Sequence, residues 1–194
     1  SDERIADLAQ ELPALIAHAQ KNTDYFKNSL REIDASSITT EAGLAALPIV
    51  RKSDMVAGVK DTLPLRKFVG IPFHALHTIY QSPGPIYEAG MRGPDWWRFG
   101  RALTAVGVGQ GDIVQNCFSY HFTPAGMMFE SAAAAVGAVV VPAGTGQTEM
   151  QATAMANLGV TVYAGTPDYL KAILEKGDAL GLDLSSVTRA CVSA

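Results

Sequence analysis

The chain has 194 residues, of which 48% are hydrophobic and 18% are charged, and its formal net charge is −4 at pH 7. This composition is too apolar for a disordered chain, and an acidic balance without a basic cluster argues against a nucleic-acid surface. The longest apolar runs are far too short to span a bilayer. We therefore expect an α/β protein that binds neither nucleic acid nor membrane.

The N-terminal residues and the two cysteines indicate a cytoplasmic protein. The first twenty residues carry acids where a secretory signal would carry basic residues, and Pro13 interrupts their apolar pattern. Cys117 and Cys191 are far apart, and each lies within an apolar run. We interpret them as small buried hydrophobic residues in a reducing compartment, not as a disulfide or a metal pair.

Residues 1–57 predict a helical N-terminal region. A second helical pattern, around residues 25–33, follows a first one with apolar residues on one face: Ile5, Leu8, Leu12, Leu15 and Ile16. Residues 58–77 show no sustained period and contain two glycines and two prolines, so we expect an irregular connection there. Residues 78–194 form the predicted α/β subdomain.

Two histidines in this connection, His74 and His77, have a spacing that would suit a metal pair on a helix. Pro72 and the β-branched neighbours favour extended chain instead, and no cysteine or carboxylate stands close by in the sequence. We therefore predict no metal site.

From residue 94 onward, helical and strand-like patterns alternate. Asp95, directly after Pro94, is typical of a helix start, and the glycines at 107 and 109 end the helical pattern. Strands are predicted at 112–118, 138–142, 160–165 and 186–194, with helical patterns between them. Such alternation with short connections is typical of a doubly wound, mostly parallel sheet, which binds ligands at the carboxyl ends of its strands.

The last strand-like run, 186–194, has no helix after it. An unfinished βα repeat leaves a sheet edge uncovered. We therefore expect the subdomain to be truncated at its C-terminal end, with the natural chain continuing past Ala194.

Four segments of the chain form a specific pattern when they are taken in order: LPIVRKSDM, GVGQGDIVQN, VVVPAGTGQTEMQ and VYAGTPDYLKAI. The pairing of GTGQTEMQ with TPDYLKAI is the most specific part. This pattern resembles the N-terminal part of phenylacetate–CoA ligases, which are adenylate-forming (acyl-CoA synthetase) enzymes. The resemblance implies the incomplete N-terminal domain of such an enzyme, because family members are more than twice as long.

The resemblance implies an acid–thiol ligase that works in two steps. ATP with Mg²⁺ converts a carboxylate to an acyl-adenylate, and the thiol of coenzyme A then displaces AMP. The nucleotide-binding residues and a mobile catalytic lysine would lie beyond Ala194, so we expect no catalytic residue and no ligase activity in this chain alone. The resemblance further implies a small carboxylic acid, aromatic in type, as the substrate, and a homodimer.

Residues 82–89 correspond to the family's phosphate loop, Ser-Ser-Gly-Thr-Thr-Gly-Lys-Pro. Ser82 and Gly84 match that loop, whereas Tyr87 replaces its second glycine and Glu88 replaces its lysine. Two prolines within the loop also remove backbone donors. Two unit charges about 4 Å apart interact by roughly 1–4 kcal/mol, so the reversed charge weakens the attraction for phosphate.

Two interpretations of this loop stay open. It is a rigid turn in a relative that no longer uses ATP in the usual way, or the phosphates are held from elsewhere and Pro-Gly-Pro presets the turn. We favour loss or strong weakening of phosphate binding because of the charge reversal. The alternative function is then a non-catalytic acyl-binding or scaffold relative that has lost ATP chemistry.

The segment FSYHFTPAG, residues 118–126, follows the predicted strand 112–118. In the family this loop helps to line the aryl pocket, and Tyr120 and Phe122 correspond to its aromatic positions. His121, a polar residue between them, could contact a ligand. The alternative is that the aromatic pair caps the sheet and that His121 is an ordinary hydrogen-bonded residue.

Overall fold

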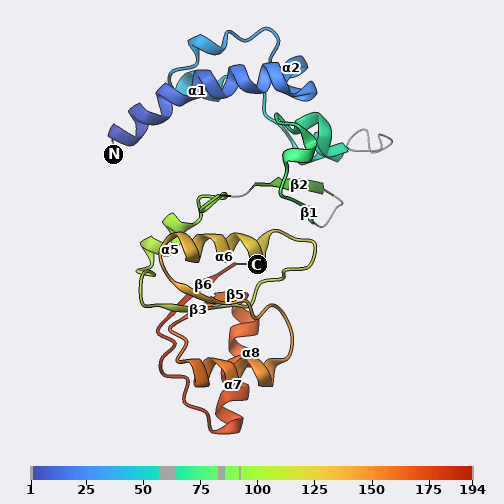
Figure 1. Cartoon of the computed structure of the whole chain (residues 1–194). Helices are drawn as coiled ribbons and strands as arrows, with labels where there is room; N and C mark the ends of the chain where they lie inside the picture. Colours follow the sequence, from blue (N-terminus) through green and yellow to red (C-terminus); the bar gives the residue numbers. More distant parts are fainter. Residues whose placement is uncertain (1, 57–63, 83–85, 92, 194) are drawn as a thin grey trace. The chain divides into compact units, whose positions relative to one another are not determined.

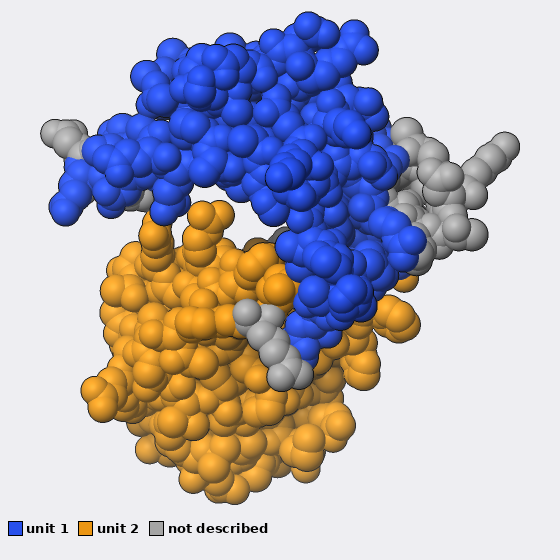
Figure 2. All heavy atoms as spheres, turned by 45° about the horizontal axis from the view of Figure 1, so that its top comes forward, with its two compact units in different colours: residues 1–79, 83–90 blue, residues 80–82, 91–194 orange. Residues whose placement is uncertain are grey.

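The structure is a computed structural model, and it describes residues 2–56, 64–82, 86–91 and 93–193. Two compact units make up the chain (Figure 2), residues 1–79 with 83–90 and residues 80–82 with 91–194. The division falls within strand β1 (Thr78–Ser82), so that its first two residues belong to unit 1 and its last three to unit 2. In the described part of the chain, no helix is long and apolar enough to cross a bilayer.

Unit 1 is mainly helical, as its apolar periodicity predicts. Its α- and 3-10 helices are α1 (Asp2–Asn22), α2 (Asp24–Ser29), η1 (Ala35–Ser37), α3 (Glu41–Ala45), α4 (Lys52–Val56), η2 (Pro64–Phe68) and η3 (Phe73–Ala75). Thr23 caps α2, because its hydroxyl accepts a hydrogen bond from the Phe26 N–H at 3.1 Å. A small core of Ile16, Leu30 and Ile38 joins α1 to the segments that follow it.

The predicted apolar face of α1 is only partly buried. Ile16 is 5% exposed, whereas Ile5 and Leu15 are 61% and 63% exposed. The period of the sequence therefore predicts the helix, but it does not specify how much of the face packs.

The histidines of the predicted connection lie at the entrance to a two-stranded sheet. This sheet consists of β1 and β2 (Ile86–Gly90). His74 lies in η3, and the His77 N–H donates to the Gly90 carbonyl at 3.0 Å. Among the described residues, no group of three or more His, Cys, Asp or Glu side chains could hold a metal ion.

Unit 2 contains the predicted α/β sheet. Four parallel strands have the order β4-β3-β5-β6, with bounds β3 (Ile113–Asn116), β4 (Val139–Val141), β5 (Val162–Gly165) and β6 (Arg189–Val192). Chain order and strand order differ, since β3 pairs with both β4 and β5. The next strand in the chain is thus added on one side of β3 first and then on its other side, and doubly wound sheets bind ligands at such a switch point. The predicted fold class is confirmed.

Helices cover both faces of this sheet (Figure 1): α5 (Gly100–Ala105) and α6 (Ala125–Ala135) on one, α7 (Thr148–Leu158) and α8 (Pro167–Leu180) on the other. Alternate strand residues serve alternate faces. Val162 and Ala164 pack in the core between the sheet and helices α5 and α6. Tyr163 packs with Met155 and Ile173 in the core between the sheet and helices α7 and α8. Burial on both faces explains the apolar runs of the central strands β3 and β5, whereas the edge strands β4 and β6 are partly exposed, with Val139 63% exposed.

The amino ends of the strands are joined by an ion pair. Asp112 lies just before β3, and its carboxylate receives hydrogen bonds from the Gly109 N–H at 2.9 Å and from the Thr161 hydroxyl at 2.8 Å. Arg189 of β6 contacts both carboxylate oxygens and also donates to the Gly107 carbonyl. The GVGQGD segment is therefore a structural turn at the edge of the sheet away from the strand carboxyl ends.

The helix predicted to start at Asp95 begins five residues later, at Gly100. Asp95 has a left-handed backbone, with φ of 51°, so it does not continue a helix. It still caps the helix, because its carboxylate accepts hydrogen bonds from the N–H groups of Phe99 at 2.7 Å and Gly100 at 2.9 Å. An added Cβ at position 100 would lie 2.9 Å from the Asp95 carboxylate, so a larger residue there would displace this cap.

Candidate functional site

A pocket of about 610 Å³ lies at the carboxyl ends of the strands in unit 2. Its lining comes from the residue before α5, the loop after β3, α6, the loop after β4, the start of α8 and the residue after β6. This is the edge at which parallel α/β sheets bind ligands, because their loops converge there.

One part of the pocket wall is aromatic. Phe118 stacks on Phe129, with ring centroids 4.4 Å apart and an angle of 22° between the planes. Phe99, just before α5, contacts the same Phe129 ring at 4.8 Å, and Met128 adds a thioether. Because Phe129 is buried in α6, the three rings support one another and form a rigid apolar surface. Such a surface suits a flat or branched apolar group.

Another part of the wall is polar and carries negative charge. Thr145 and Gly146 follow β4, and Thr166, Asp168 and Tyr169 begin α8. Hydrogen bonds from the Thr166 hydroxyl and from backbone N–H groups lower the pKa of Asp168, so it is ionised at neutral pH. No lysine, arginine or histidine stands among the described residues that line the pocket.

Asn116, the last residue of β3, holds both ends of the loop that follows. It is fully buried, and its Nδ2 donates to the Tyr120 hydroxyl and to the Gly126 carbonyl, both at 2.8 Å. Its Oδ1 accepts a hydrogen bond from the Phe118 N–H at 3.2 Å. This amide therefore positions Phe118 at the pocket wall.

Tyr120, predicted to bind substrate, lies within this loop and is not among the lining residues of the pocket. Its ring lies on the backbone of Gly126, where an added Cβ would be 2.8 Å from the ring. Burial, together with a hydrogen bond to Glu130 and the charge of that residue, raises the pKa of the Tyr120 hydroxyl well above its ordinary value. The hydroxyl is consequently neutral across the physiological range.

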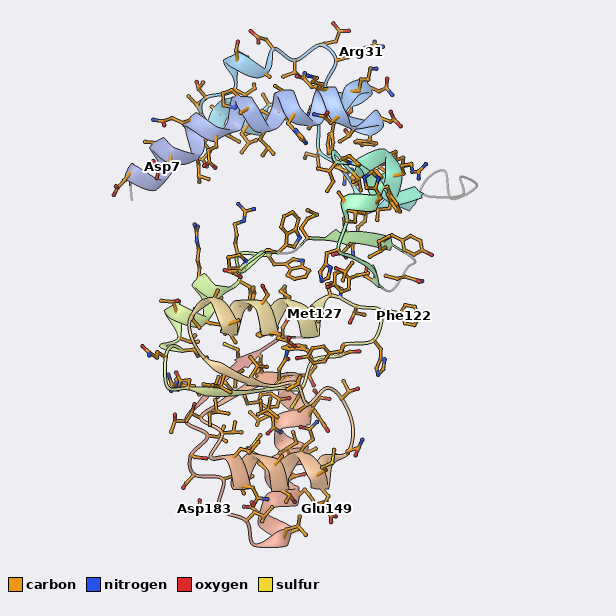
Figure 3. The ribbon with its side chains drawn as sticks, in the orientation of Figure 1. Asp7, Arg31, Phe122, Met127, Glu149 and Asp183 are labelled. Atoms are coloured by element: carbon orange, nitrogen blue, oxygen red, sulfur yellow. The ribbon has the colours of Figure 1, made fainter. Side chains whose placement is uncertain are left out.

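The other two predicted substrate-binding residues are exposed. His121 donates through its backbone N–H to the Ser119 hydroxyl at 3.2 Å. Phe122, on the loop before α6 (Figure 3), is 77% exposed and has a left-handed backbone with φ of 60°. Its carbonyl accepts a hydrogen bond from the Gln81 N–H at 2.8 Å. Contact of Tyr120, His121 and Phe122 with substrate stays a prediction.

Three of the four predicted phosphate-loop residues, Ser82, Tyr87 and Glu88, lie on the two strands of the small sheet. Ser82 is the last residue of β1, and Gly84 lies outside the described residues. Tyr87 and Glu88 are half-buried residues of β2. Their contact with phosphate likewise stays a prediction.

Two buried glutamines behind the pocket were not singled out from the sequence. Gln115 of β3 is fully buried and Gln151 of α7 is 3% exposed, and their side chains are hydrogen-bonded to each other at 2.7 Å. A signal was present for the first, because a glutamine inside the apolar run IVQNCF needs a buried partner. The partner is 36 residues away, so local patterns do not identify it.

Comparison with known proteins relates the chain to one group of enzymes. No family model matches. The phenylacetate–coenzyme A ligase of Aromatoleum evansii is 24% identical over 191 residues, which cover 94% of this chain and 42% of the relative. That of Escherichia coli (strain K12) is 25% identical over 201 residues, which cover 94% and 44%. The chain is a distant relative of phenylacetate–coenzyme A ligases. The predicted resemblance is therefore confirmed, and the chain spans about two fifths of the length of these relatives.

Solved structures show the same fold for the N-terminal portion of an adenylate-forming CoA ligase. A 2-hydroxyisobutyryl-CoA ligase in the postadenylation state, in complex with 2-HIB-AMP, matches 100% of this chain and 43% of its own, with a TM-score of 0.87 and 17% identity. The same enzyme in an open conformation, in complex with 2-HIB-AMP and CoA, gives a TM-score of 0.85 at 18% identity and covers 100% and 44%. These matches show the fold of the chain.

Proposed function

We propose that this chain provides the acyl-binding part of an ATP-dependent carboxylate–CoA ligase. The full reaction would convert a carboxylate to an acyl-adenylate and then to an acyl-CoA. The observation that carries the proposal is the aromatic-walled pocket at the strand carboxyl ends, in a chain related to phenylacetate–coenzyme A ligases. Phe118, Phe129 and Phe99 would contact the apolar part of the acid.

The charge of the pocket orients such a ligand. Asp168 is ionised and exposed, and it repels a nearby negative charge, with solvent screening part of this repulsion. The carboxylate of the acid would therefore point away from Asp168, and its apolar end would lie against the phenylalanine rings. Thr145 and Thr166 also line the pocket, and their neutral hydroxyls can form hydrogen bonds with polar atoms of the ligand without adding charge.

The described residues offer little support for a Mg²⁺–ATP site. They contain no group of three or more His, Cys, Asp or Glu side chains that could hold a metal ion, the pocket lining carries no cation, and the sequence resemblance aligns Glu88 with the lysine of the family's phosphate loop. We propose that this chain binds the acyl group and that the nucleotide is held by other parts of a full ligase. Glu88 also favours the second candidate function, an acyl-binding or scaffold relative without ATP chemistry.

Ligand binding tests the acyl pocket. Phenylacetate titrated into the 194-residue chain should perturb the NMR signals of Phe118, Phe129 and Thr145, with a Kd on the order of millimolar for so small a ligand. Benzylamine, which replaces the carboxylate by a cation, is the matched control for orientation. No saturable binding of any aromatic or branched carboxylate would contradict the proposal.

Pyrophosphate release tests the division of labour. With ATP, Mg²⁺, coenzyme A and phenylacetate, the chain alone should release no carboxylate-dependent pyrophosphate. Detectable release would show that the chain holds a complete adenylation site. In a longer protein that contains this chain, the ligase and the non-catalytic alternative differ in whether acyl-CoA forms.

A further inference from the structure

The pocket wall after β4 has an irregular backbone. Between β4 and α7, the 143–147 loop places Gly144 and Gly146 at φ of 66° and 82°, and Gln147 at 55°. Thr145 and Gly146 of this loop line the pocket. A segment of this kind makes no ladder of its own, so its carbonyl groups need other partners.

Gln151, in the first turn of α7, supplies those partners. Its Nε2 lies 3.2 Å from the Ala143 carbonyl oxygen, 3.0 Å from that of Gly144 and 3.4 Å from that of Gly146. A side-chain amide has only two N–H groups, so three carbonyls share them. One buried side chain therefore gathers most of the loop's carbonyl groups.

The other end of the same amide is fixed by β3. Gln151 Oε1 accepts hydrogen bonds from Gln115 Nε2 at 2.7 Å and from the Cys117 thiol at 3.4 Å. Gln115 Nε2 also donates to the Gln151 carbonyl at 3.1 Å. Burial raises the pKa of the Cys117 thiol to about 12, so the thiol stays protonated and remains a donor. These donors orient the Gln151 amide with its nitrogen toward the loop.

This arrangement leaves Gln115 Oε1 buried with no hydrogen-bond partner in the described part of the structure. An unpaired buried acceptor is unfavourable. Turning the Gln115 amide over would place its oxygen against Gln151 Oε1 and the Gln151 carbonyl, which are both acceptors. The Gln115 amide therefore keeps the orientation in which its nitrogen donates to Gln151, although its own oxygen stays unpaired. This orientation directs the Gln151 nitrogen toward the 143–147 loop.

Two further hydrogen bonds hold the loop from other elements. The Gly144 N–H donates to the Asn116 carbonyl at 2.9 Å, and the Tyr169 hydroxyl of α8 donates to the Gly146 carbonyl. The loop is thus attached to β3, α7 and α8, and Gln151 is the member that contacts three of its carbonyls without lining the pocket itself.

We propose that Gln151 is a positioning residue that sets the width of the acyl pocket and thereby selects carboxylates by size. It acts through the 143–147 loop and touches no ligand. The proposal rests on the proposed acyl-binding function. A residue that served only to stabilise the fold would change stability without changing the preference between ligands.

The test compares Gln151→Met with Gln110→Glu. Methionine keeps the length of the side chain but has no N–H groups, and Gln110 is exposed in the turn before β3, away from the pocket. NMR titration gives the ratio of the affinities for phenylacetate and 1-naphthylacetate. We expect Gln151→Met to shift this ratio about tenfold, as the loss of one set of buried hydrogen bonds allows, and Gln110→Glu to leave it unchanged.

Amide hydrogen exchange gives a readout that needs no ligand. In Gln151→Met the Gly144 N–H should exchange faster, while the amides of the β5 core keep their protection. If the parent chain binds no carboxylate but this exchange still depends on Gln151, the acyl function fails and the loop-positioning part survives. If it binds, and Gln151→Met alters neither ratio nor exchange, the proposal is overturned.

A second variant keeps the test decisive where Gln151→Met does not fold. Tyr169→Phe removes the hydroxyl that donates to the Gly146 carbonyl and leaves the half-buried ring in the pocket wall. Because this residue also lines the pocket, exchange at Gly144, which needs no ligand, separates the effect on the loop from a direct contact. It should shift the same affinity ratio in the same direction by a smaller factor and speed exchange at Gly144. An unchanged ratio together with unchanged exchange would overturn the proposal.

Discussion

At the amino edge of the unit 2 sheet, Asp112 and Arg189 carry opposite charges, whereas at the carboxyl edge the buried polar residues Gln115, Asn116 and Gln151 are neutral amides. Both sets join strands that are distant in the sequence. The ion pair ties β6 to the turn before β3, while the amides tie β3 to the loops around the pocket.

The difference follows from what each edge has to do. A partly buried ion pair destabilises the fold when either member is removed, because the other charge is then left uncompensated. Such a pair suits an edge that only has to hold the strands together. Buried amides orient loops through directional hydrogen bonds and add no charge beside a ligand. In a pocket that already contains ionised Asp168, a further charge would compete with the carboxylate of an acid.

Removal of one member of the ion pair should have the largest effect. Asp112→Ala leaves the Arg189 guanidinium, the Thr161 hydroxyl and the Gly109 N–H without their shared acceptor, and we expect unit 2 to lose roughly 2–4 kcal/mol of unfolding free energy. Urea unfolding followed by the fluorescence of Trp96 and Trp97, which both belong to unit 2, measures this loss. Lys171→Gln, which breaks an exposed i,i+4 pair with Glu175, is the control and should cost less than about 0.5 kcal/mol.

The same pair sets the acid limit of the amino edge. Burial opposes ionisation of Asp112, but hydrogen bonds from Gly109, Thr161 and Arg189 and the charge of Arg189 outweigh it and lower its pKa below the ordinary value. The stabilisation is therefore fully present above the unfolded pKa of about 3.9 and is lost as pH falls through the lower folded pKa. If Asp112→Ala lost less than about 1 kcal/mol of unfolding free energy at neutral pH, the amino edge would not depend on the ion pair.

At the carboxyl edge, stability should instead be lost at alkaline pH. Burial raises the pKa of Cys117 to about 12, tempered by a hydrogen bond from Gln115, against an ordinary value of 9.0. The unfolded thiol ionises first, so stability should fall between about pH 9 and 12, by up to about 1.4 kcal/mol per pH unit. In Cys117→Ser the serine hydroxyl keeps a hydrogen-bond donor toward Gln151 but does not ionise in this pH range.

Unfolding free energies of the parent chain and of Cys117→Ser, measured from pH 8 to 11, give the comparison. The difference between the two slopes reports Cys117 together with its charge coupling to Tyr120 and Tyr163, because burial and the charge of Cys117 both raise the pKa values of these tyrosines. Parallel slopes would mean that the Cys117 environment does not disfavour the thiolate.

The sequence predicts the sheet but not the network at its carboxyl edge. Alternating runs such as VTVYAG and TPDYLKAI report local burial and helical period, and these specify strands, helices and the edge that binds ligands. The Gln115–Gln151 pair joins β3 to α7 across 36 residues, and its partners become visible only when the strands are placed side by side.

Loop residues after β3 show a second limit. The sequence predicts the right loop for the pocket, yet the residues that line it include Phe118, Ser119 and Thr123, while Tyr120 folds back on Gly126. Strand alternation ends at Asn116, and beyond it the direction of each side chain depends on individual hydrogen bonds. Asp95 follows the same rule, since it caps a helix that starts five residues later than its position predicts.

Substitution of Phe122 should have the smallest effect on stability. A left-handed backbone costs a non-glycine residue about 1–2 kcal/mol, and glycine relieves this while losing about 0.5–1 kcal/mol through its larger unfolded-state entropy. Phe122→Gly should therefore be more stable than Phe122→Ala by roughly 0.5–1 kcal/mol in urea unfolding. Both variants lack the ring, so they isolate backbone strain at φ of 60°.

The same two variants decide what the ring does. If Phe122 contacts the acyl group, as predicted from the sequence, both variants should bind phenylacetate several-fold more weakly, although one of them is more stable than the other. A strained, 77% exposed aromatic residue whose removal weakens binding is held in place for its ligand. Unchanged binding in both would leave Tyr120 and His121 to account for the predicted contact.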